Sequence, residues 1–374
     1  MNRAPARNGW QEYWSDGVTP DFDVIIVGAG PAGSTCATFC AQAGLRALLI
    51  EREKFPREKV CGDCLNPACS SVLDRLGLGQ RVHALAQARL ESVEFIAIDG
   101  QKVIVDLQEK EVAIKRSLLD ELLLRRAGEL GTEIREETTA TTLSRNALWT
   151  IRTNQNESFC ARILVGADGR NSTVARLCNL LPRPERERIA LQSHVPLARD
   201  FGQRIVLQFL PGGYSGQSPV NDTELNVCLV AKPRGIGALK TWATRRFTLS
   251  PDHSWRTITP LTRAAVSPAH EDLFFIGDAA RVVEPFTGEG IYYAMRSGEL
   301  AANAIVKLIR GEDRPSTLRE FARAFAEMYR GRLWINRLAR AAVLAPRIGS
   351  LFVHTARLNP AILKFLTAKI VHSL

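Results

Sequence analysis

Cysteine is scarce in this sequence, with eight residues among 374. A chain of this size would need denser cysteine if disulfide bonds were to build its fold. The residues before the first predicted strand are polar and aromatic, and they lack the apolar centre of a secretory signal. We therefore expect reduced thiols in a cytoplasmic protein.

Charged residues are absent from residues 24–45, so a hydropathy search would notice this stretch as a candidate membrane span. The stretch contains Gly, Ser, Thr, Gln and Pro, however, and it changes from a β-branched run to a glycine turn and then to an alanine-rich segment. This order is typical of a buried strand followed by a helix. No transmembrane segment is predicted.

Acidic residues are absent from residues 328–374, and the whole chain has a net charge of +10. Residues 310–374 contain twelve Lys or Arg and four Asp or Glu, so they carry most of this excess. Such a segment can contact an anionic membrane surface. An amphipathic helix that covers the domain is an equal alternative, because Arg330, Arg337 and Arg340 fall on one helical face. No nucleic-acid partner is expected, since the chain has no basic reading helix and no aromatic stacking motif.

A βαβ unit is predicted near the start of the chain. Residues 23–27 read as a buried strand, an alanine-rich helix ends near Gly44, and residues 45–50 form a second strand that leads into Glu51. A glycine pattern joins the first strand to the helix, and this context makes it meaningful. The turn consists of Gly28, Gly30, Pro31, Ala32 and Gly33.

Each part of this unit has a role in binding a dinucleotide. Gly28 allows the tight turn, Gly30 lets the backbone approach a pyrophosphate, and Gly33 lets the helix and strand pack closely. The helix N-terminus offers free N–H groups and a partial positive charge to the diphosphate. Glu51 is placed to accept hydrogen bonds from ribose hydroxyls, and its charge would repel a 2′-phosphate, which argues against NADP at this site.

The rest of the chain indicates a second, β-rich layer. Antiparallel hairpins are predicted from residues 92–98, 102–107, 148–153 and 158–164. Other predicted elements are strands at 163–167, 205–210, 224–231 and 273–276, helices at 116–128 and 290–309, and a turn-rich stretch at 211–221. Residues 52–69 form a connection too long for an ordinary loop, and such loops usually carry function. The pattern predicts an α/β fold with an inserted antiparallel sheet.

Four segments carry a family resemblance across residues 22–310. They read DVIIVGAGPAG, KVCGD, ILVGADGRNSTVAR and LFFIGDAARVVEPFTGEGIYYAMRSGELAA. Together they resemble the geranylgeranyl reductase family of FAD enzymes, within the aromatic-hydroxylase-like flavoproteins. The resemblance implies a Rossmann-like FAD-binding domain, an inserted antiparallel-sheet substrate domain and a C-terminal helical segment. The FAD-binding domain would comprise residues 22–87, 108–187 and 256–310, the substrate domain 88–107 and 188–255, and the basic helical segment 311–374.

The resemblance also implies which residues hold the FAD. Asp278 would bind a ribityl hydroxyl, Asp168 would lie beside the pyrophosphate, and Arg116 would touch the phosphate or adenine region. The helix that begins at Gly290 would point its N-terminus at the flavin ring and stabilise its anionic reduced form. Simple helix caps are the alternative for the two aspartates, and a solvated charge for Arg116. The remaining expected FAD contacts are Arg52, Cys61, Gly62, Gly169, Gly277, Pro285, Gly288, Glu289 and Ile291.

The pair Cys61 and Cys64 forms a C-x-x-C pattern, which can be a redox dithiol when a thiol pKa is depressed. No second C-x-x-C or His pair follows at zinc-finger spacing, so no metal site is expected. In the resembled family the first cysteine recurs beside the flavin, whereas the second position is usually small. We favour Cys61 as a residue at the flavin and Cys64 as an incidental thiol, with a redox pair as the alternative.

Tyr214 lies in the stretch PGGYSGQSP, where the family has a tyrosine, tryptophan and phenylalanine motif that lines the substrate cavity. Only Tyr214 and Pro219 persist, and Gly216 stands where the tryptophan would be. This departure puts specificity for a prenyl chain in doubt. Cys61 and Tyr214 are the candidate catalytic residues.

The expected reaction is hydride transfer from reduced flavin to a carbon–carbon double bond in a small hydrophobic substrate, such as an isoprenoid or polyketide-derived chain. A monooxygenase that uses a flavin hydroperoxide is the alternative, and a flavin-binding protein without turnover is a third hypothesis. The halogenase signature W-x-W-x-I-P is absent. No second dinucleotide motif is present, so the electron donor is expected to be transiently bound NAD(P)H, a ferredoxin or a quinol.

Overall fold

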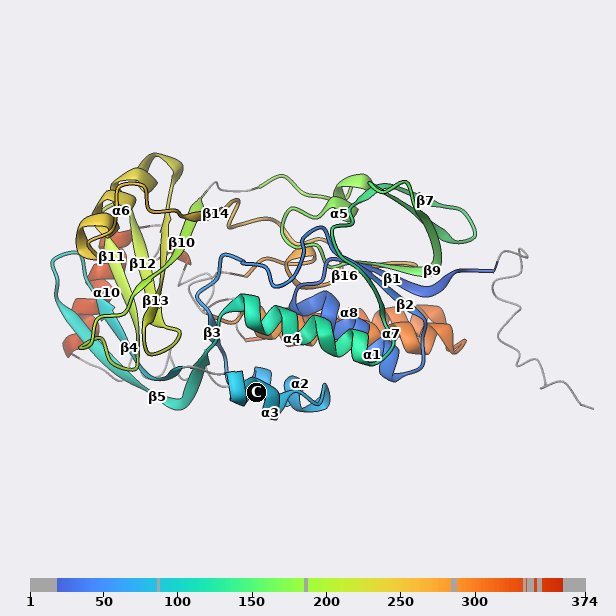
Figure 1. Ribbon diagram of the computed structural model, residues 1–374, viewed down its shortest axis with the longest axis horizontal. Coiled ribbons are helices and arrows are strands. Elements are labelled where there is room, and N and C mark those ends of the chain that lie inside the picture. Colours follow the sequence, from blue (N-terminus) through green and yellow to red (C-terminus); the bar gives the residue numbers. More distant parts are fainter. Residues whose placement is uncertain are drawn as a thin grey trace, which may run out of the picture.

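The computed structural model describes residues 19–85, 88–184, 188–283, 288–331, 334, 340–341 and 345–358. Two β-sheets lie at opposite ends of the long axis of the molecule (Figure 1). The first sheet is bordered by α1, α4, α7 and α8, whereas α6 and α10 flank the second. The chain passes between the sheets several times, so residues far apart in sequence meet at their junction.

The first sheet has a parallel core of apolar strands. β1 (Phe22–Val27) pairs in parallel with β2 (Ala47–Ile50) on one side and with β9 (Ser158–Gly166) on the other. Residues 24–26 of β1 are completely buried, as expected for a strand covered on both faces. The remaining strands of this sheet are β6 (Glu133–Arg135), β7 (Ala140–Arg145), β8 (Trp149–Thr153), β15 (Ala269–His270) and β16 (Leu273–Phe275). The predicted βαβ unit is confirmed.

Two long helices pack closely against this sheet and against each other. α1 (Pro31–Gln42) follows the glycine turn, and α7 (Gly290–Ile309) has the bounds predicted from the sequence. A side chain on Gly298 would place its Cβ 2.4 Å from the carbonyl oxygen of Ala32, so the glycine permits this helix contact. The other helices of this half are α2 (Cys69–Arg75), α3 (Gly79–Leu85), α4 (Arg116–Glu129), α5 (Thr173–Leu177) and α8 (Arg314–Met328).

The second sheet is mainly antiparallel, in the order β14-β10-β13-β12-β11-β4-β5-β3, and only β11 and β4 pair in parallel. Alternate residues of β13 face opposite ways: Leu229 packs toward α6 (Pro233–Arg246), and Val230 packs toward α10 (Pro346–Leu358). The strands are β3 (Cys64–Leu65), β4 (Ala88–Ile96), β5 (Lys102–Ala113), β10 (Ile189–Pro196), β11 (Arg204–Leu210), β12 (Gly213–Pro219), β13 (Glu224–Ala231) and β14 (Arg256–Ile258).

The second sheet differs from the sequence expectation in two ways. Residues 211–221 were expected to be turns, but β12 forms a central strand there, because β11 and β13 pair with both of its edges. A Cβ on Gly213 would come within 2.1 Å of the carbonyl oxygen of Val230, so its glycine serves close packing. The expected domain limits also shift, since β5 continues to Ala113, and β14 and β3 join this sheet.

Within the described residues, no helix combines the length and the apolar character needed to cross a bilayer. The uncharged stretch at residues 24–45 lies in β1, α1 and the turns that follow each of them.

Glu111 is buried in β5 beside Cys64 and Cys69, and burial raises its pKa to about 7. The folded protein therefore holds this proton more tightly than the unfolded chain, so the stabilising effect is present at low pH and lost as the pH rises through 7. As the pH is raised from 5 to 8.5, we expect the unfolding free energy of Glu111→Gln to rise by on the order of 3 kcal/mol relative to that of the unaltered protein. Urea titrations at several pH values measure this gain. Asp106→Asn, on the exposed side of the same strand, is the control, and an equal gain there would contradict the prediction.

Candidate flavin site

The glycine turn after β1 has a backbone conformation that residues with a side chain rarely adopt. Gly28 has φ +103°, and its Cβ would lie 2.6 Å from the carbonyl oxygen of Ala167 at the end of β9. The Glu51 carboxylate, buried below the turn, accepts a hydrogen bond of 2.8 Å from the Ala29 N–H. The N-cap residue Gly30 provides no side chain to cap α1. The helix therefore presents its N-terminus to a ligand at the turn.

A group of cationic side chains surrounds this turn. Burial lowers the pKa of Lys59 to about 8, with further lowering from Arg170, Arg116 and Arg57. A Cβ on Gly30 would be 3.6 Å from a terminal nitrogen of Arg57, so this guanidinium lies at the point where a pyrophosphate would approach. The Arg57 Nε is buried and has no hydrogen-bond partner within the described residues. Mutually repelling cations at a helix N-terminus favour an anionic ligand.

Arg116 is buried in this group, which corrects the alternative that it is a solvated charge. Its guanidinium makes a bidentate ion pair with Asp120, at 2.7 and 2.8 Å. Arg57 contacts the same Asp120 carboxylate at 3.2 Å. One carboxylate thus orients two guanidiniums, and positive charge remains for a ligand.

The two predicted aspartates differ in their environments. The Asp168 Oδ2 accepts hydrogen bonds from Thr173 N and Val174 N, so this residue does cap α5, the alternative reading from the sequence. Its Oδ1 is buried and has no partner among the described residues. The Asp278 carboxylate pairs with Arg170 at 2.6 Å, and none of the described helices has it as an N-cap. Both carboxylates lie where the parallel strands β9 and β16 end.

The other predicted contacts lie in different environments. Arg52 is exposed and pairs with Glu53 at 3.4 Å, whereas Ile291 is buried in an apolar cluster with Leu65 and residues of α2 and α4. Glu289 is buried and accepts the Tyr293 hydroxyl at 2.9 Å. Pro285 lies outside the described residues. The residues at the two glycine-rich turns and the start of α7 are Pro31, Ala32, Gly33, Gly169, Gly277, Gly288 and Gly290.

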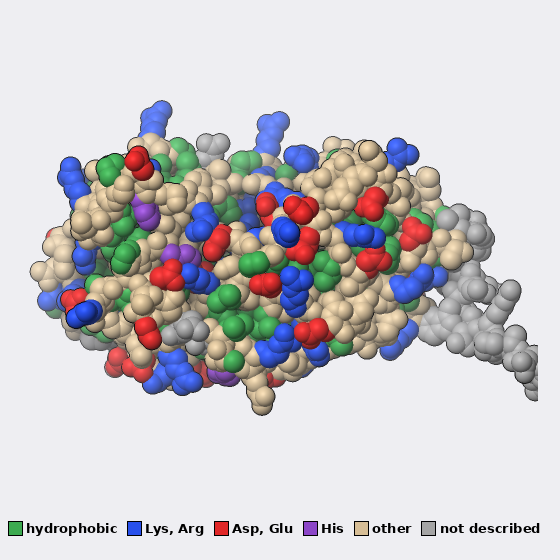
Figure 2. Space-filling model, in the orientation of Figure 1, with side chains coloured by type: hydrophobic (Ala, Val, Ile, Leu, Met, Phe, Trp, Pro, Cys, Tyr) green, Lys and Arg blue, Asp and Glu red, His purple; other side chains and the backbone are tan. Residues whose placement is uncertain are grey.

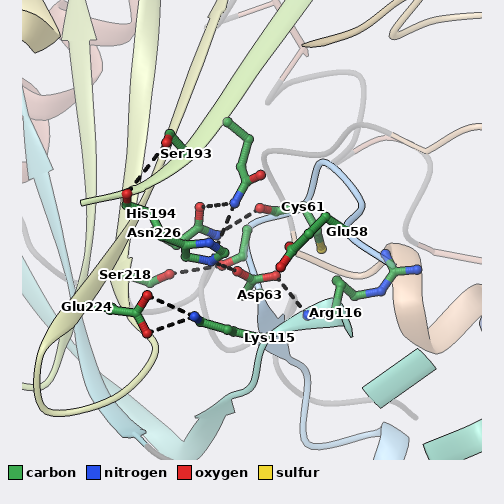
Figure 3. Close-up of polar contacts among 12 residues, drawn as sticks. Glu58, Cys61, Asp63, Lys115, Arg116, Ser193, His194, Ser218, Glu224 and Asn226 are labelled. Atoms are coloured by element: carbon green, nitrogen blue, oxygen red, sulfur yellow. Dashed lines mark hydrogen bonds and ion pairs between the residues drawn. The ribbon is translucent and has the colours of Figure 1, made fainter. Parts of the chain in front are cut away.

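Residues 61–63, which precede β3, form a loop that is hydrogen-bonded to the second sheet (Figure 3). The Cys61 carbonyl accepts the Asn226 amide at 2.8 Å and the Cys228 thiol at 3.2 Å, both from β13. The Gly62 carbonyl accepts the Ser218 hydroxyl of β12 at 2.9 Å. The loop therefore connects the glycine-turn half of the molecule with the sheet at its other end.

Asp63 makes the central contact of this loop. It has φ +58°, an unusual value for a residue with a side chain, and it is buried. Its Oδ2 lies 2.8 Å from His194 Nε2 on β10, and its Oδ1 accepts the Arg116 N–H at 3.3 Å. Burial raises the pKa of Asp63, while His194 and Arg116 oppose the shift. We call Asp63 with His194 the loop clamp.

The cysteines around the loop are free thiols. Burial raises the pKa of Cys61, although neighbouring Arg116 opposes the shift, and it raises the pKa of Cys64 and Cys228 more strongly. A redox dithiol requires a depressed thiol pKa. The raised pKa values of Cys61 and Cys64 therefore do not favour the redox pair, and the position of Cys61 at the flavin stays a prediction.

Tyr214 is buried on β12, in an apolar cluster that includes Val230 and the α10 residue Val353. It occupies the same face of the strand as Ser218, because side chains two or four positions apart point the same way. Tyr214 and the loop contacts thus share one side of the sheet, and Val60, next to Cys61, packs against the Tyr214 cluster.

Comparison with known proteins supports the flavin interpretation. A model of the FAD-binding domain matches residues 21–200. The digeranylgeranylglycerophospholipid reductase of Methanocella arvoryzae is 30% identical over 325 residues, which cover 78% of this chain and 79% of that protein. The chain belongs to the geranylgeranyl reductase family. It is accordingly an FAD-dependent oxidoreductase.

Other members and neighbours of this reductase family carry varied names. A menaquinone reductase of Mycolicibacterium smegmatis is 28% identical over 75% of both chains. Conditioned medium factor receptor 1 of Dictyostelium discoideum is 28% identical over 78% of this chain, but the match spans only 64% of that longer protein. Among solved structures, flavin-dependent brominase Bmp2 has a TM-score of 0.76 at 21% identity, covering 94% of both chains. PqsL of Pseudomonas aeruginosa has a TM-score of 0.75 at 19% identity, over 88% of this chain and 99% of that one.

FAD fits the residues that this family member presents. The glycine turn with its uncapped helix and the cations Arg57 and Lys59 suit a pyrophosphate, and the unpartnered Asp168 Oδ1 is a free acceptor beside them. Glu51 retains acceptor capacity for a ribose, a role that stays a prediction.

Sequence reasoning missed several residues of this candidate flavin site. Arg57, Lys59 and Asp63 lie in the long connection at residues 52–69, whose length was the available signal. His194 gave a weaker signal: with Gln192 and Ser193 it forms a polar run inside an otherwise apolar strand.

Proposed function

We propose that this protein reduces carbon–carbon double bonds in the isoprenoid chain of a lipid or quinone. The observation that carries the proposal is the 30% identity with a digeranylgeranylglycerophospholipid reductase along most of both chains. A relative named menaquinone reductase supports the same class of substrate. The stretch around Tyr214 and Gly216 departs from the family motif, so the proposal names no particular isoprenoid substrate.

Reduced FAD, when bound, supplies the hydride. The protein must then hold the substrate and provide a proton for the second carbon of the double bond. Cys61 is our first candidate for the proton donor, because burial keeps its thiol protonated at neutral pH and hydrogen bonds from Asn226 and Cys228 to its carbonyl fix its backbone. Tyr214 is the second candidate, since it lies on the side of the sheet that the loop contacts.

Residues of the chain also have a role in holding the reduced cofactor. The N-terminus of α7 at Gly290 offers partial positive charge, and Arg116 lies beside Cys61. Positive charge near a flavin favours its anionic reduced form. The electron donor is proposed to be NAD(P)H, a ferredoxin or a quinol that binds transiently.

Monooxygenation is the second candidate, because PqsL, which is described as a probable FAD-dependent monooxygenase, shares this fold. The identity with that structure is too low to support more than the fold. The two reactions differ in how the reduced protein treats oxygen and an alkene, so one experiment can separate them.

The holoprotein would be reduced without oxygen and then mixed either with a geranylgeranyl lipid or with oxygenated buffer, while flavin absorbance is followed. We expect the alkene to reoxidise the flavin with the gain of one H2 per double bond in the product mass. Oxygen is expected to reoxidise it without a long-lived oxygen adduct. A persistent adduct and an unchanged lipid would refute the reductase proposal, and protein that never retains flavin would refute both reactions. Cys61→Ala is expected to slow the alkene step without loss of flavin.

A further inference from the structure

We propose that α10 docks the protein on an anionic lipid surface through an outward stripe formed by Ile348, Leu351 and Leu358. The basic tail by itself left membrane contact and simple packing as equal alternatives, and the structure now assigns the two roles to opposite faces of one helix. This inference concerns binding to a bilayer and does not depend on the reaction proposed above.

The inner face of α10 is already occupied. Val353 and Ala356 are buried in the cluster with Tyr214, and a Cβ on Gly349 would come within 2.3 Å of the Phe209 ring. Ser350 is also buried, and its hydroxyl accepts the Ile98 N–H at 2.9 Å. These contacts hold the helix against β4, β5 and β11 and fix which residues face outward.

The outer face is apolar although nothing among the described residues covers it. Ile348, Leu351 and Leu358 are 58%, 64% and 89% exposed. Their spacing of three and seven residues places them on one stripe of the helix, opposite the buried residues. Ile98, at the hairpin tip beneath the helix, is a fourth exposed apolar side chain. Exposed apolar groups gathered in this way mark an interaction site.

The charges around the stripe indicate an anionic partner. Arg347 and Arg357 lie on α10, whereas the neighbouring acid Asp99 is already paired with His354 at 3.1 Å. No acidic residue occurs after Glu327, and the sixteen residues after α10 contribute two more lysines. On the face shown in Figure 2, by contrast, basic and acidic side chains are interspersed.

An anionic bilayer matches both features of this surface. Apolar side chains at the interface enter the acyl boundary, and flanking Lys and Arg contact the headgroups. A second copy of the chain would bring the same positive charge against itself. Nucleic acid would use the cations but leave the apolar stripe without a role.

Vesicle flotation of the full-length holoprotein tests the proposal. We expect binding to vesicles of phosphatidylcholine with phosphatidylglycerol, and weak binding to phosphatidylcholine alone. Ile348→Gln with Leu351→Gln is expected to weaken binding about tenfold or more, because two apolar side chains no longer enter the bilayer. Arg347→Gln should weaken binding only to the anionic vesicles.

Ile104→Gln is the matched control, and it should bind like the unaltered protein. Ile104 is 50% exposed, but it lies between Val103 and Val105, whose side chains face α10, so it points to the opposite side of the sheet. Flavin absorbance and circular dichroism establish that each variant is folded. Equal flotation of the double variant and the unaltered protein would overturn the proposal. An unaltered protein that binds no vesicles, but forms a dimer that the double substitution disrupts, would overturn it as well.

Discussion

Protein with alanine at position 28 is expected to retain little or no flavin and to be less stable. The backbone at Gly28 has φ +103°, and an added Cβ would meet the Ala167 carbonyl oxygen and the Asp168 Cα within 2.7 Å. These neighbouring atoms belong to the backbone at the end of a buried strand, so displacing them would cost much free energy. We expect Gly28→Ala to cost about 3 kcal/mol or more in unfolding free energy. Urea unfolding and the ratio of flavin to protein absorbance measure the two effects.

Two further glycines separate packing from cofactor binding in this experiment. A Cβ on Gly30 has only an ordinary contact, 3.6 Å from Arg57, so Gly30→Ala should fold normally and lose flavin affinity, because the methyl group obstructs the pyrophosphate. Gly237 in α6 has open space around it, so Gly237→Ala should leave the flavin content unchanged and should raise stability by up to about 1 kcal/mol, as alanine does inside a helix. Full flavin content in the Gly28→Ala protein would show that the turn is not the cofactor site.

Asparagine at position 63 is expected to slow turnover strongly while leaving the flavin bound. The Asp63 carboxylate is buried against His194 and the Arg116 N–H, and the amide can no longer form the charge-assisted contact. Loss of such a contact costs about 1.5–3 kcal/mol, which corresponds to a decrease of about tenfold to 100-fold in kcat. Stopped-flow reoxidation of the reduced flavin by the alkene measures this rate.

The clamp interpretation requires that Asp63 and His194 act together. We expect His194→Gln to have a similar effect and the double variant to be little worse than either single variant. Lys115 and Glu224 form an ion pair of 2.7 Å near the clamp, and within the described residues neither side chain forms a hydrogen bond or ion pair with residues 61–64, so Glu224→Gln is the control. Additive effects of the two clamp variants, or an equal loss with Glu224→Gln, would contradict the interpretation.

Local sequence patterns were sufficient for the elements that build the flavin half. β1, α1 and α7 were predicted because each combines a distinctive apolar pattern with a glycine next to one end, and these signals depend on near neighbours. Glu51 could be placed beneath the glycine turn because a short βαβ unit leaves little freedom in the distance between them. The sequence by itself thus determined a dinucleotide site and, through the family motifs, its occupation by FAD.

The loop clamp was decided only by the tertiary structure. Asp63 and His194 are 131 residues apart, and neither has a local pattern that requires the other. β12 reads as a turn by composition, and it is a strand because neighbours on both sides supply its hydrogen bonds. The sequence showed that the tail is basic, but it did not show which side of α10 is exposed. That side is fixed by the packing of Gly349 and Val353 against the second sheet. Contacts between segments that are distant in sequence form, and stabilise the protein, only when the whole fold brings those segments together. Local sequence patterns therefore cannot reveal them.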